Sequence, residues 1–404
     1  MMMSSFSYVD RVVVGILAPL IKADLHLTDT QLGVISGTSF GLVYFAFTLP
    51  MGWIADRIKR VRLIGCCLAA WSIFTIICGC TTSFLQLLAA RLGLGAAEAG
   101  GTTPAHSLLV DFFPPGQRAR VLSAYSFSNP IGITLAGLFC WALVDPLGWR
   151  GVLILLGGLG FTLAILLILL LREPPRGAFD LAKADTLPFR RSLAILLRKR
   201  AFALMLVAGG IFALVTTCQL FWIPSYLVRS FHISAAQSSG IFGAIALLSG
   251  LVGAALGGWV TDYLVVRRSP SAYLDVPIAC VGFGILPVVG MLTTPHLAIG
   301  ITCYFLAATL LAASFGPILA AIQYLAPPGI RATASAMNSA VTIGAGMAVG
   351  VPLIGALSDR LAPAAGSDSL RLALLYALPL FLAASAALYF LASRTLVRDA
   401  GAAA

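Results

Sequence analysis

Charged residues are scarce in this chain. Only 10% of its 404 residues are Asp, Glu, Lys or Arg, whereas 59% are hydrophobic, and a soluble domain carries about 25% charged residues. This composition excludes an ordinary soluble protein. A hydrocarbon core of about 30 Å needs about 20 apolar helical residues, and we count twelve such runs, which predict an all-α membrane protein with twelve transmembrane helices. The runs lie near residues 4–22, 30–55, 63–80, 84–110, 119–143, 149–171, 201–227, 235–261, 273–292, 297–326, 332–357 and 371–393.

The chain also lacks the spacings that metal sites and disulfide frameworks need. All eight of its cysteines lie in or at the ends of apolar runs, so we expect them to pack as small hydrophobic residues and predict no metal and no cofactor. Gly37-Thr38-Ser39-Phe40-Gly41 fits a hydrolase pattern, but that pattern requires a strand, a turn and a helix, and here it falls inside a predicted helix. We therefore predict that the protein is not an enzyme.

No basic segment followed by a cleavage site opens the chain, so no removable signal peptide is expected. An ionisable residue, Asp10, follows after only nine residues, which rise about 14 Å in a helix. The first helix is therefore predicted to start at or near residue 1.

Positive charge is sorted along the chain, whose formal net charge is +11. If the N-terminus is inside, 19 of the 26 Lys and Arg residues lie in the even-numbered loops and the C-terminal tail, five lie in outer loops, and two, Arg11 and Arg91, lie within the membrane. The positive-inside rule then predicts a multi-pass inner-membrane protein with both termini in the cytoplasm. It also accounts for the net charge without a nucleic-acid partner.

A polar stretch over residues 172–200 divides the chain, which predicts a six-helix bundle at 1–171 and a second at 201–404, joined by a cytoplasmic linker. The motif Pro-Pro-Gly-x-Arg at 114–118 recurs at 327–331, and Gly52-x-x-x-Asp56 is echoed by Gly258-x-x-x-Asp262. Such repeats build many transporters, with the binding site between the repeats near the bilayer midplane. Glycines four residues apart, at 33, 37 and 41 and at 253 and 257, further predict close helix packing.

Four charged side chains interrupt the apolar runs: Asp10 and Arg11 in the first, and Arg91 and Glu98 in the fourth. A charged group at the bilayer centre costs about 2.5–3.5 kcal/mol on insertion scales, so such residues usually mark the path of an ion, a proton or a substrate. These positions predict a transporter.

Several motifs resemble one family. Gly52-x-x-x-Asp56-Arg57 and Arg91-x-x-x-Gly95 resemble signatures of the major facilitator superfamily. A second set, spread along almost the whole chain, is similar to its spinster-like branch. That set comprises Tyr8-Val9-Asp10-Arg11, Asp29-Thr30-Gln31-Leu32-Gly33, Gly95-Ala96-Ala97-Glu98-Ala99-Gly100, Gly148-Trp149-Arg150, Arg172-Glu173-Pro174-Pro175-Arg176, Phe221-Trp222-Ile223-Pro224-Ser225 and Arg331-Ala332-Thr333-Ala334-Ser335.

The resemblance implies a secondary transporter, a bacterial member of the branch, that works by alternating access. It implies proton-coupled movement of lysophospholipids or sphingoid lipids, with the proton gradient as energy source. It also implies an inner gate that contains Asp56, Arg57 and Arg60, with Asp262 at the repeated position.

The four charged residues within the predicted membrane spans have two possible roles, structural and functional. Arg91 and Glu98 are seven residues apart and share a helix face, so pairing of Arg11 with Glu98 and of Asp10 with Arg91 is sterically reasonable. One reading is a pair of permanent ion pairs that hold the bundle together. The other is that Asp10 and Glu98 carry the coupled proton while Arg11, whose planar fork binds anions in a bidentate way, anchors the substrate beside Arg91.

The second half lacks charged residues in its central turns, apart from Asp275 near one end of its helix. A cavity charged on one side and apolar on the other fits an amphipathic, lipid-type substrate. An alternative is a proton symporter of small organic anions, and an alternative of another class is a non-transporting receptor. We expect a monomer whose other partners are protons and membrane lipids. The remaining candidate substrate-binding residues are Asn129, Gln219, Trp222, Tyr226, Gln323 and Asn338.

Overall fold

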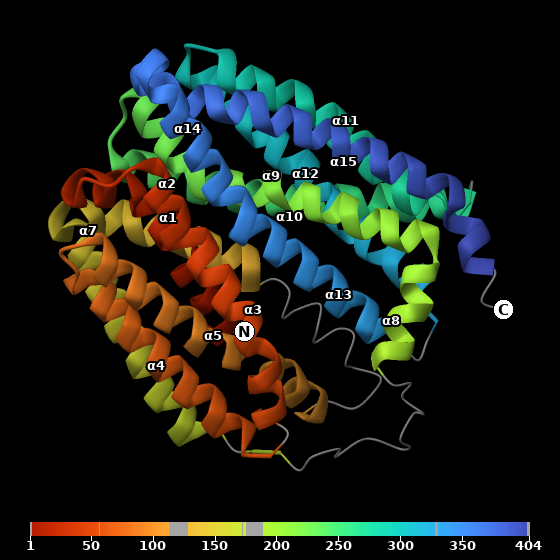
Figure 1. The fold of residues 1–404 in the computed structure, drawn as a ribbon, viewed down its shortest axis with the longest axis horizontal. Coiled ribbons are helices and arrows are strands. Elements are labelled where there is room, and N and C mark those ends of the chain that lie inside the picture. The colour runs from red at the N-terminus through yellow and green to blue at the C-terminus, as the bar shows by residue number, and fades with distance from the viewer. Residues whose placement is uncertain are drawn as a thin grey trace. The chain divides into compact units, whose positions relative to one another are not determined.

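The computed structural model describes residues 2–55, 57–112, 128–171, 173–174, 189–267, 269–327 and 330–401, and no strand occurs among them. Figure 1 shows the helices in chain order. They are α1 (Met2–Leu25), α2 (Asp29–Gly33), the π-helical η1 (Val34–Thr38), α3 (Ser39–Ala55), α4 (Arg60–Cys80), α5 (Phe84–Phe112), α7 (Ser128–Leu170), α8 (Phe189–Arg198), α9 (Arg200–Phe231), α10 (Ala235–Arg267), α11 (Ala272–Thr293), α12 (Leu297–Leu325), α13 (Arg331–Ile343), the π-helical η3 (Gly344–Gly350), α14 (Val351–Ala365), the 3₁₀ turn η4 (Gly366–Asp368) and α15 (Ser369–Gly401).

The first helix begins at Met2, as its early charged pair requires. It ends at Leu25, and His26 adopts a left-handed φ of 51°. A capping box then starts α2, because the Thr28 side chain accepts from the backbone N–H of Gln31 while the Gln31 side chain accepts from the backbone N–H of Thr28. The sequence therefore encodes the stop and the restart locally.

Twelve helical passes can be followed in the described part of the chain. Nine stretches there are long and apolar enough to cross a membrane, and two of these, Ser128–Leu170 and Thr333–Asp399, each hold two passes. The break in α7 falls at Gly148, where φ is 65° and ψ is 176°, a conformation that favours glycine. With α5, another long helix, the count is the predicted twelve.

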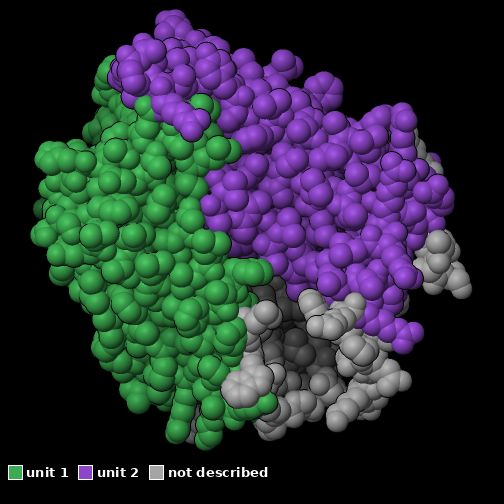
Figure 2. All heavy atoms as spheres, viewed as in Figure 1, with its two compact units in different colours: residues 1–182, 220–244, 351–359 green, residues 183–219, 245–350, 360–404 purple. Residues whose placement is uncertain are grey.

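Two compact units divide the chain by its internal contacts, and Figure 2 shows them in green and purple. Unit 1 consists of residues 1–182, 220–244 and 351–359, and unit 2 of residues 183–219, 245–350 and 360–404. Part of the predicted linker at 172–200 is helical, since it contains α8. The division into six-helix halves at 171 and 201 stays a prediction, and the first copy of the Pro-Pro-Gly repeat lies outside the described residues.

Small residues allow close backbone approaches inside each unit. In unit 1, a Cβ atom added to Gly137 would lie 2.6 Å from the Cα atom of Gly243. In unit 2, a Cβ atom on Gly253 would lie 2.5 Å from the carbonyl oxygen of Thr309, and one on Gly257 would meet the backbone of Ala313. These contacts confirm the predicted role of small residues, which let transmembrane helices pack closely.

Candidate functional site

The intramembrane charges of the first half form one cluster inside unit 1. Helix α1 supplies Asp10 and Arg11, and α5 supplies Arg91 and Glu98. Asp10, Arg91 and Glu98 are each only 1% exposed. Charged groups at such depth need partners or a function, because burying an unpaired charge is costly.

The predicted pair of Arg11 and Glu98 is confirmed. Arg11 Nε donates to Glu98 Oε1 at 2.5 Å, and the Ser7 hydroxyl donates to the same oxygen. Glu98 Oε2 has no hydrogen-bond partner among the described residues. Glu98 is thus neutralised through one oxygen while the other stays available.

Three aromatic rings surround the Arg11 guanidinium. Its carbon lies 5.4 Å from the ring centroid of Tyr8, 5.5 Å from that of Phe40 and 4.8 Å from that of Tyr44. Each distance suits a cation–π contact, and we call these three rings the Arg11 cage. Among the described residues, Arg11 donates hydrogen bonds only through Nε, and its side chain is 12% exposed. Its two Nη groups therefore remain for a ligand.

The second predicted pair, Asp10 with Arg91, does not form within the described residues. Asp10 instead accepts a hydrogen bond from the Thr75 hydroxyl at 3.1 Å, and no described residue donates to its Oδ2 atom. The Arg91 guanidinium carbon lies 5.4 Å from the Phe40 ring centroid, and its Nε and Nη2 atoms donate to no acceptor in the described part of the chain. Asp10 thus contacts the Thr75 hydroxyl and Arg91 contacts the Phe40 ring, in place of the predicted ion pair between Asp10 and Arg91.

Both aromatic candidates, Trp222 and Tyr226, pack in the interior of unit 1. Trp222 is fully buried, and its indole N–H donates to the carbonyl oxygen of Val351 at 3.1 Å. Tyr226 is buried as well, with its ring 5.7 Å from that of Phe231. A role for either in binding substrate stays a prediction.

The polar candidates occupy different environments. In unit 2, Gln323 donates to the Ser335 hydroxyl at 2.6 Å. Gln219 Nε2 and Asn338 Oδ1 are buried, and neither has a hydrogen-bond partner within the described ranges. Asn129 is partly exposed near the start of α7 in unit 1. Gln219 and Asn338 therefore have unused hydrogen-bonding capacity for a ligand or water.

The structure describes three of the four gating candidates, because Asp56 lies outside the described residues. Arg57 is exposed in the turn after α3, and Asp262 is exposed on α10. Arg60 begins α4, and its Nε atom donates to Glu173 Oε1 at 3.0 Å. The sequence analysis placed Arg60 in the predicted inner gate but did not identify Glu173 as its partner.

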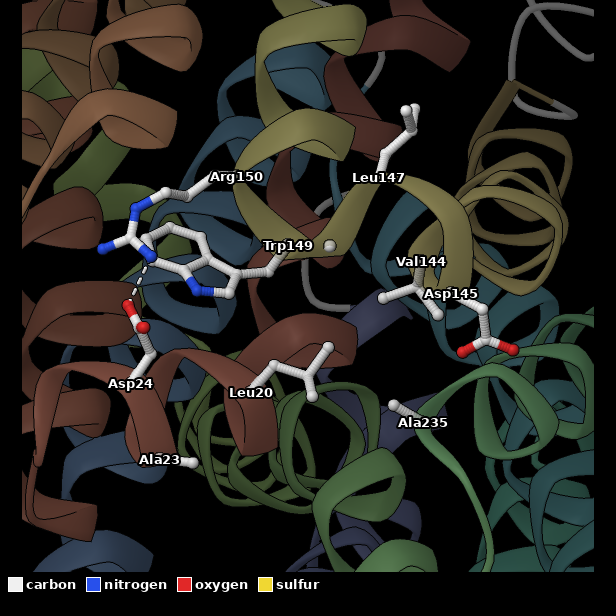
Figure 3. Close-up of a pocket in the computed structure, with 10 residues that line it drawn as sticks. Leu20, Ala23, Asp24, Val144, Asp145, Leu147, Trp149, Arg150 and Ala235 are labelled. Atoms are coloured by element: carbon white, nitrogen blue, oxygen red, sulfur yellow. Dashed lines mark ion pairs between the residues drawn. The ribbon is translucent and has the colours of Figure 1, made fainter.

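An open pocket of about 700 Å³ lies elsewhere in unit 1, between α1 and the break in α7. Figure 3 shows Arg150 pairing with Asp24 and lying beside Trp149. Arg150 Nη1 lies 2.5 Å from Asp24 Oδ2, and the Arg150 guanidinium carbon lies 4.3 Å from the Trp149 ring centroid. No predicted site residue lines this pocket, so the charged cluster remains the candidate site. The pocket is lined by Leu20, Ala23, Asp24, Val144, Asp145, Leu147, Gly148, Trp149, Arg150 and Ala235.

Comparison with known families assigns this architecture. The Major Facilitator Superfamily profile matches residues 1–350 of the chain. The chain belongs to the Major Facilitator Superfamily. It is accordingly a multi-pass membrane transporter and not an enzyme, and the predicted facilitator fold is confirmed.

This facilitator is similar in sequence to several curated transport proteins. It is 31% identical over 406 residues to an MFS-type efflux pump of Mycolicibacterium smegmatis (strain ATCC 700084 / mc(2)155), covering 98% of this chain and 92% of the pump. It is 29% identical over 389 residues to protein spinster homolog 1 of Homo sapiens, covering 88% of this chain and 71% of the homolog.

A solved structure agrees with these sequence relatives. A bacterial homolog to the human lysosomal transporter Spinster, crystallised in an inward-facing and unoccupied conformation, superposes with a TM-score of 0.89 at 26% identity. The match covers 98% of this facilitator and 96% of that chain. The resemblance to the spinster-like branch is thereby confirmed.

Glu173 caps one end of α4 in this facilitator. Besides Arg60 Nε, it accepts from the backbone N–H of Arg60 at 3.2 Å and from that of Val61 at 2.8 Å. Burial alone would raise the pKa of this carboxyl, but the hydrogen bonds from Val61 and Arg60 and the Arg60 charge hold it below its usual range. A carboxylate at a helix N-terminus is stabilising, because it satisfies N–H groups that have no helical partner.

We expect Glu173→Gln to lower the stability of the protein by about 1 kcal/mol at neutral pH, as loss of a helix cap does. Because the pKa of Glu173 is lower in the folded state, its contribution is fully present above about pH 4.3, the ordinary value for glutamate, and is lost as the pH falls through the lowered value. Thermal unfolding in detergent at fixed scan rate, from pH 7 down to pH 3, measures this.

Asp145→Asn is the control, since Asp145 is exposed and makes no hydrogen bond or ion pair with described residues. It should match the parent protein at every pH. If Glu173→Gln lost stability on acidification as steeply as the parent protein does, another group would be responsible for the acid sensitivity.

Proposed function

We propose that this facilitator is a proton-coupled transporter of amphipathic, lipid-type substrates that works by alternating access. The observation that carries the proposal is the Arg11 site, a buried guanidinium held by Glu98 and by the Arg11 cage while its Nη groups make no hydrogen bond to described residues. A cation fixed in this way at membrane depth suits a transported anionic head.

The two buried carboxylates have different surroundings, which divides their proposed roles. Glu98 has Arg11 and Ser7 as partners, so it fixes the guanidinium. Asp10 has the Thr75 hydroxyl and makes no ion pair with a described residue. Protonation relieves the cost of an unpaired buried charge, so Asp10 is the proposed proton carrier. Glu98, the other predicted carrier, can join it when substrate displaces Arg11.

The head-group chemistry follows from Arg11. Its two Nη groups can donate parallel hydrogen bonds to a phosphate or a carboxylate, which adds geometric specificity to the charge attraction. A phosphate of a lysophospholipid and the carboxylate of a small organic acid share this chemistry. The substrate class therefore depends on what surrounds the rest of the molecule.

The second half of the chain favours a substrate with an apolar tail. Its helices carry no charged residue in their central turns. Gln219 and Asn338, two of its residues with a buried polar atom that has no hydrogen-bond partner among the described residues, are neutral. A small, doubly charged solute clamped between the halves would lack a cation from the second half to offset its charge. An acyl or sphingoid chain needs only apolar surface, since each buried methylene contributes about 0.8 kcal/mol.

The location of the protein completes the proposal. The sorting of Lys and Arg favours an inner-membrane protein with cytoplasmic termini. In this orientation, Arg60 and Glu173 lie at the cytoplasmic end of unit 1, and Asp24 and Asp29 lie at the opposite end.

Competition binding with a chain-length series tests the substrate class. Lysolipids with one head group and tails of increasing length should bind the purified protein progressively more tightly. The gain should be about fourfold per methylene at most, the equivalent of 0.8 kcal/mol, until the tail fills its site. Gluconate and benzoate serve as tail-free comparisons. If these acids compete well while lysolipids of every length fail, the organic-anion symporter replaces this proposal.

A further inference from the structure

A third buried carboxylate, Asp29, is the centre of a network at the other end of unit 1 from Arg60. Its side chain is 2% exposed. Both of its oxygens accept from Arg229, at 2.6 and 2.8 Å, and Lys22 donates to one of them at 2.6 Å. The Ser358 hydroxyl donates to the other at 2.7 Å. Asp29 thus joins α1 and α2 to α9 and α14.

Asp359 makes a matching connection from α14. Its carboxylate accepts from the backbone N–H groups of Asp29 and Thr30, at 3.0 and 2.7 Å, and from the Thr30 hydroxyl at 2.6 Å. These two N–H groups belong to the first turn of α2, where helical partners are missing. A residue 330 positions along the chain from Asp29 therefore caps α2.

The backbones beneath this network touch. A Cβ atom added to Gly33 would lie 2.6 Å from the Cα atom of Pro352, and one added to Gly355 would meet the backbone of Asp29. Glycine at both positions lets α2 and α14 approach closely enough for the side chains of Asp359 and Ser358 to reach. The Asp24–Arg150 ion pair at the same end of unit 1 joins α1 to α7, both in the first half of the sequence.

We propose that Asp29, Lys22, Arg229, Ser358 and Asp359 form a latch that holds this end of the transporter shut and must break once in each transport cycle. Lys22 and Asp29 belong to the first half of the sequence, whereas Arg229, Ser358 and Asp359 belong to the second. Alternating access separates the two halves at one end and then at the other. This inference rests on that part of the proposed function, and it is independent of the substrate and of the proton.

The chemistry of the latch suits a reversible contact. Lys22 and Arg229 both pair with Asp29, and Asp359 accepts from the N–H groups that begin α2, so both carboxylates have partners while the contact is closed. Removing one partner from a buried, hydrogen-bonded charge pair costs several kilocalories per mole, but each of these groups can be hydrated when the end opens. The contact should therefore strongly stabilise the closed state and still break when this end of the transporter opens.

Spin-label distances test the latch without substrate or gradient. Labels at Leu147 and His232, both exposed, report on the two halves of the sequence in a background whose eight native cysteines have been replaced. In lipid nanodiscs, Asp29→Asn and Arg229→Gln should each raise the ratio of long to short label distances at least about tenfold. The double variant should do no more than either single variant, because both remove the same contact.

Asp24→Asn is the matched control, since it breaks an ion pair at the same end of unit 1 but within the first half. It should leave the distances unchanged. Ser358→Ala removes the hydroxyl that donates to Asp29 and should give a smaller shift of the same direction. It keeps the test decisive if Asp29→Asn fails to fold. Unchanged distances in the Arg229 and Ser358 variants, or additive shifts in the double variant, would overturn the latch. Failure of lysolipids to bind would leave it standing.

Discussion

Asp10→Asn is expected to abolish accumulation of substrate driven by a pH gradient while substrate binding and exchange continue. Asparagine keeps the shape of the side chain and can still accept from Thr75, but it cannot release a proton. With one proton per substrate, a gradient of one pH unit can support about tenfold accumulation, because one unit is worth about 1.36 kcal/mol. The variant should equilibrate its substrate with no accumulation in proteoliposomes.

Glu98→Gln provides the comparison that separates the two carboxylates. Because Glu98 holds Arg11 at 2.5 Å, its loss should weaken substrate binding as well as coupling, whereas Asp10→Asn should change coupling alone. Thr75→Val tests positioning, since it removes the hydroxyl that donates to Asp10 and should shift the pH profile of transport without eliminating it. Gradient-driven accumulation by Asp10→Asn at the parental level would exclude Asp10 as the proton carrier.

Arg11→Gln is expected to weaken substrate binding about 10- to 100-fold. A hydrogen bond to a charged group contributes about 1.5–3 kcal/mol, and the buried guanidinium supplies both the charge and the fork. Arg11→Lys should give an intermediate loss, because lysine retains the charge but cannot donate two parallel hydrogen bonds. Equilibrium binding of a lysolipid to the purified variants measures both changes.

Arg150→Gln controls for a general effect of removing an arginine from unit 1. Arg150 also pairs with a carboxylate and lies over an aromatic ring, but it is far more exposed than Arg11 and should leave binding unchanged. A parental affinity in Arg11→Gln would show that the anionic head binds elsewhere, and Arg91 would become the next candidate.

Hydrophobic runs and helix periodicity were sufficient to predict much of the fold. The twelve passes, the start of α1 near residue 1 and the pairing of Arg11 with Glu98 all depend on where apolar residues recur and on which residues share a helix face. The capping box that starts α2 is equally local, because Thr28 and Gln31 are three residues apart.

Long-range contacts between polar groups could not be predicted in the same way. Asp10 and Arg91 are close in the predicted bundle, but the Thr75 hydroxyl and the Phe40 ring compete for them, and the sequence does not reveal which partner wins. Glu173 and Asp359 each cap a helix far away in the chain. The residues next to Glu173 and Asp359 in the sequence therefore do not indicate which helix each one caps.

The aromatic neighbours of Arg11 left a weak signal in the sequence. Tyr8 is three residues before Arg11 on one helix face, and Phe40 and Tyr44 are four residues apart on another. The same spacing is found wherever aromatic residues simply pack between helices, so it did not distinguish a cage from ordinary packing.

The π-helical turn η1 sets the direction in which the second pass presents its side chains. Gly33 and Phe40 are seven residues apart, so a regular α-helix would turn about 700° between them and place both on nearly the same face. A π-turn accommodates one extra residue, which rotates the later residues back by about 100°. Gly33 can thus meet α14 while Phe40 lies beside Arg11 and Arg91. The rotation introduced by this one π-turn therefore lets the same helical pass contact α14 at the latch and place Phe40 against the charged cluster near its middle.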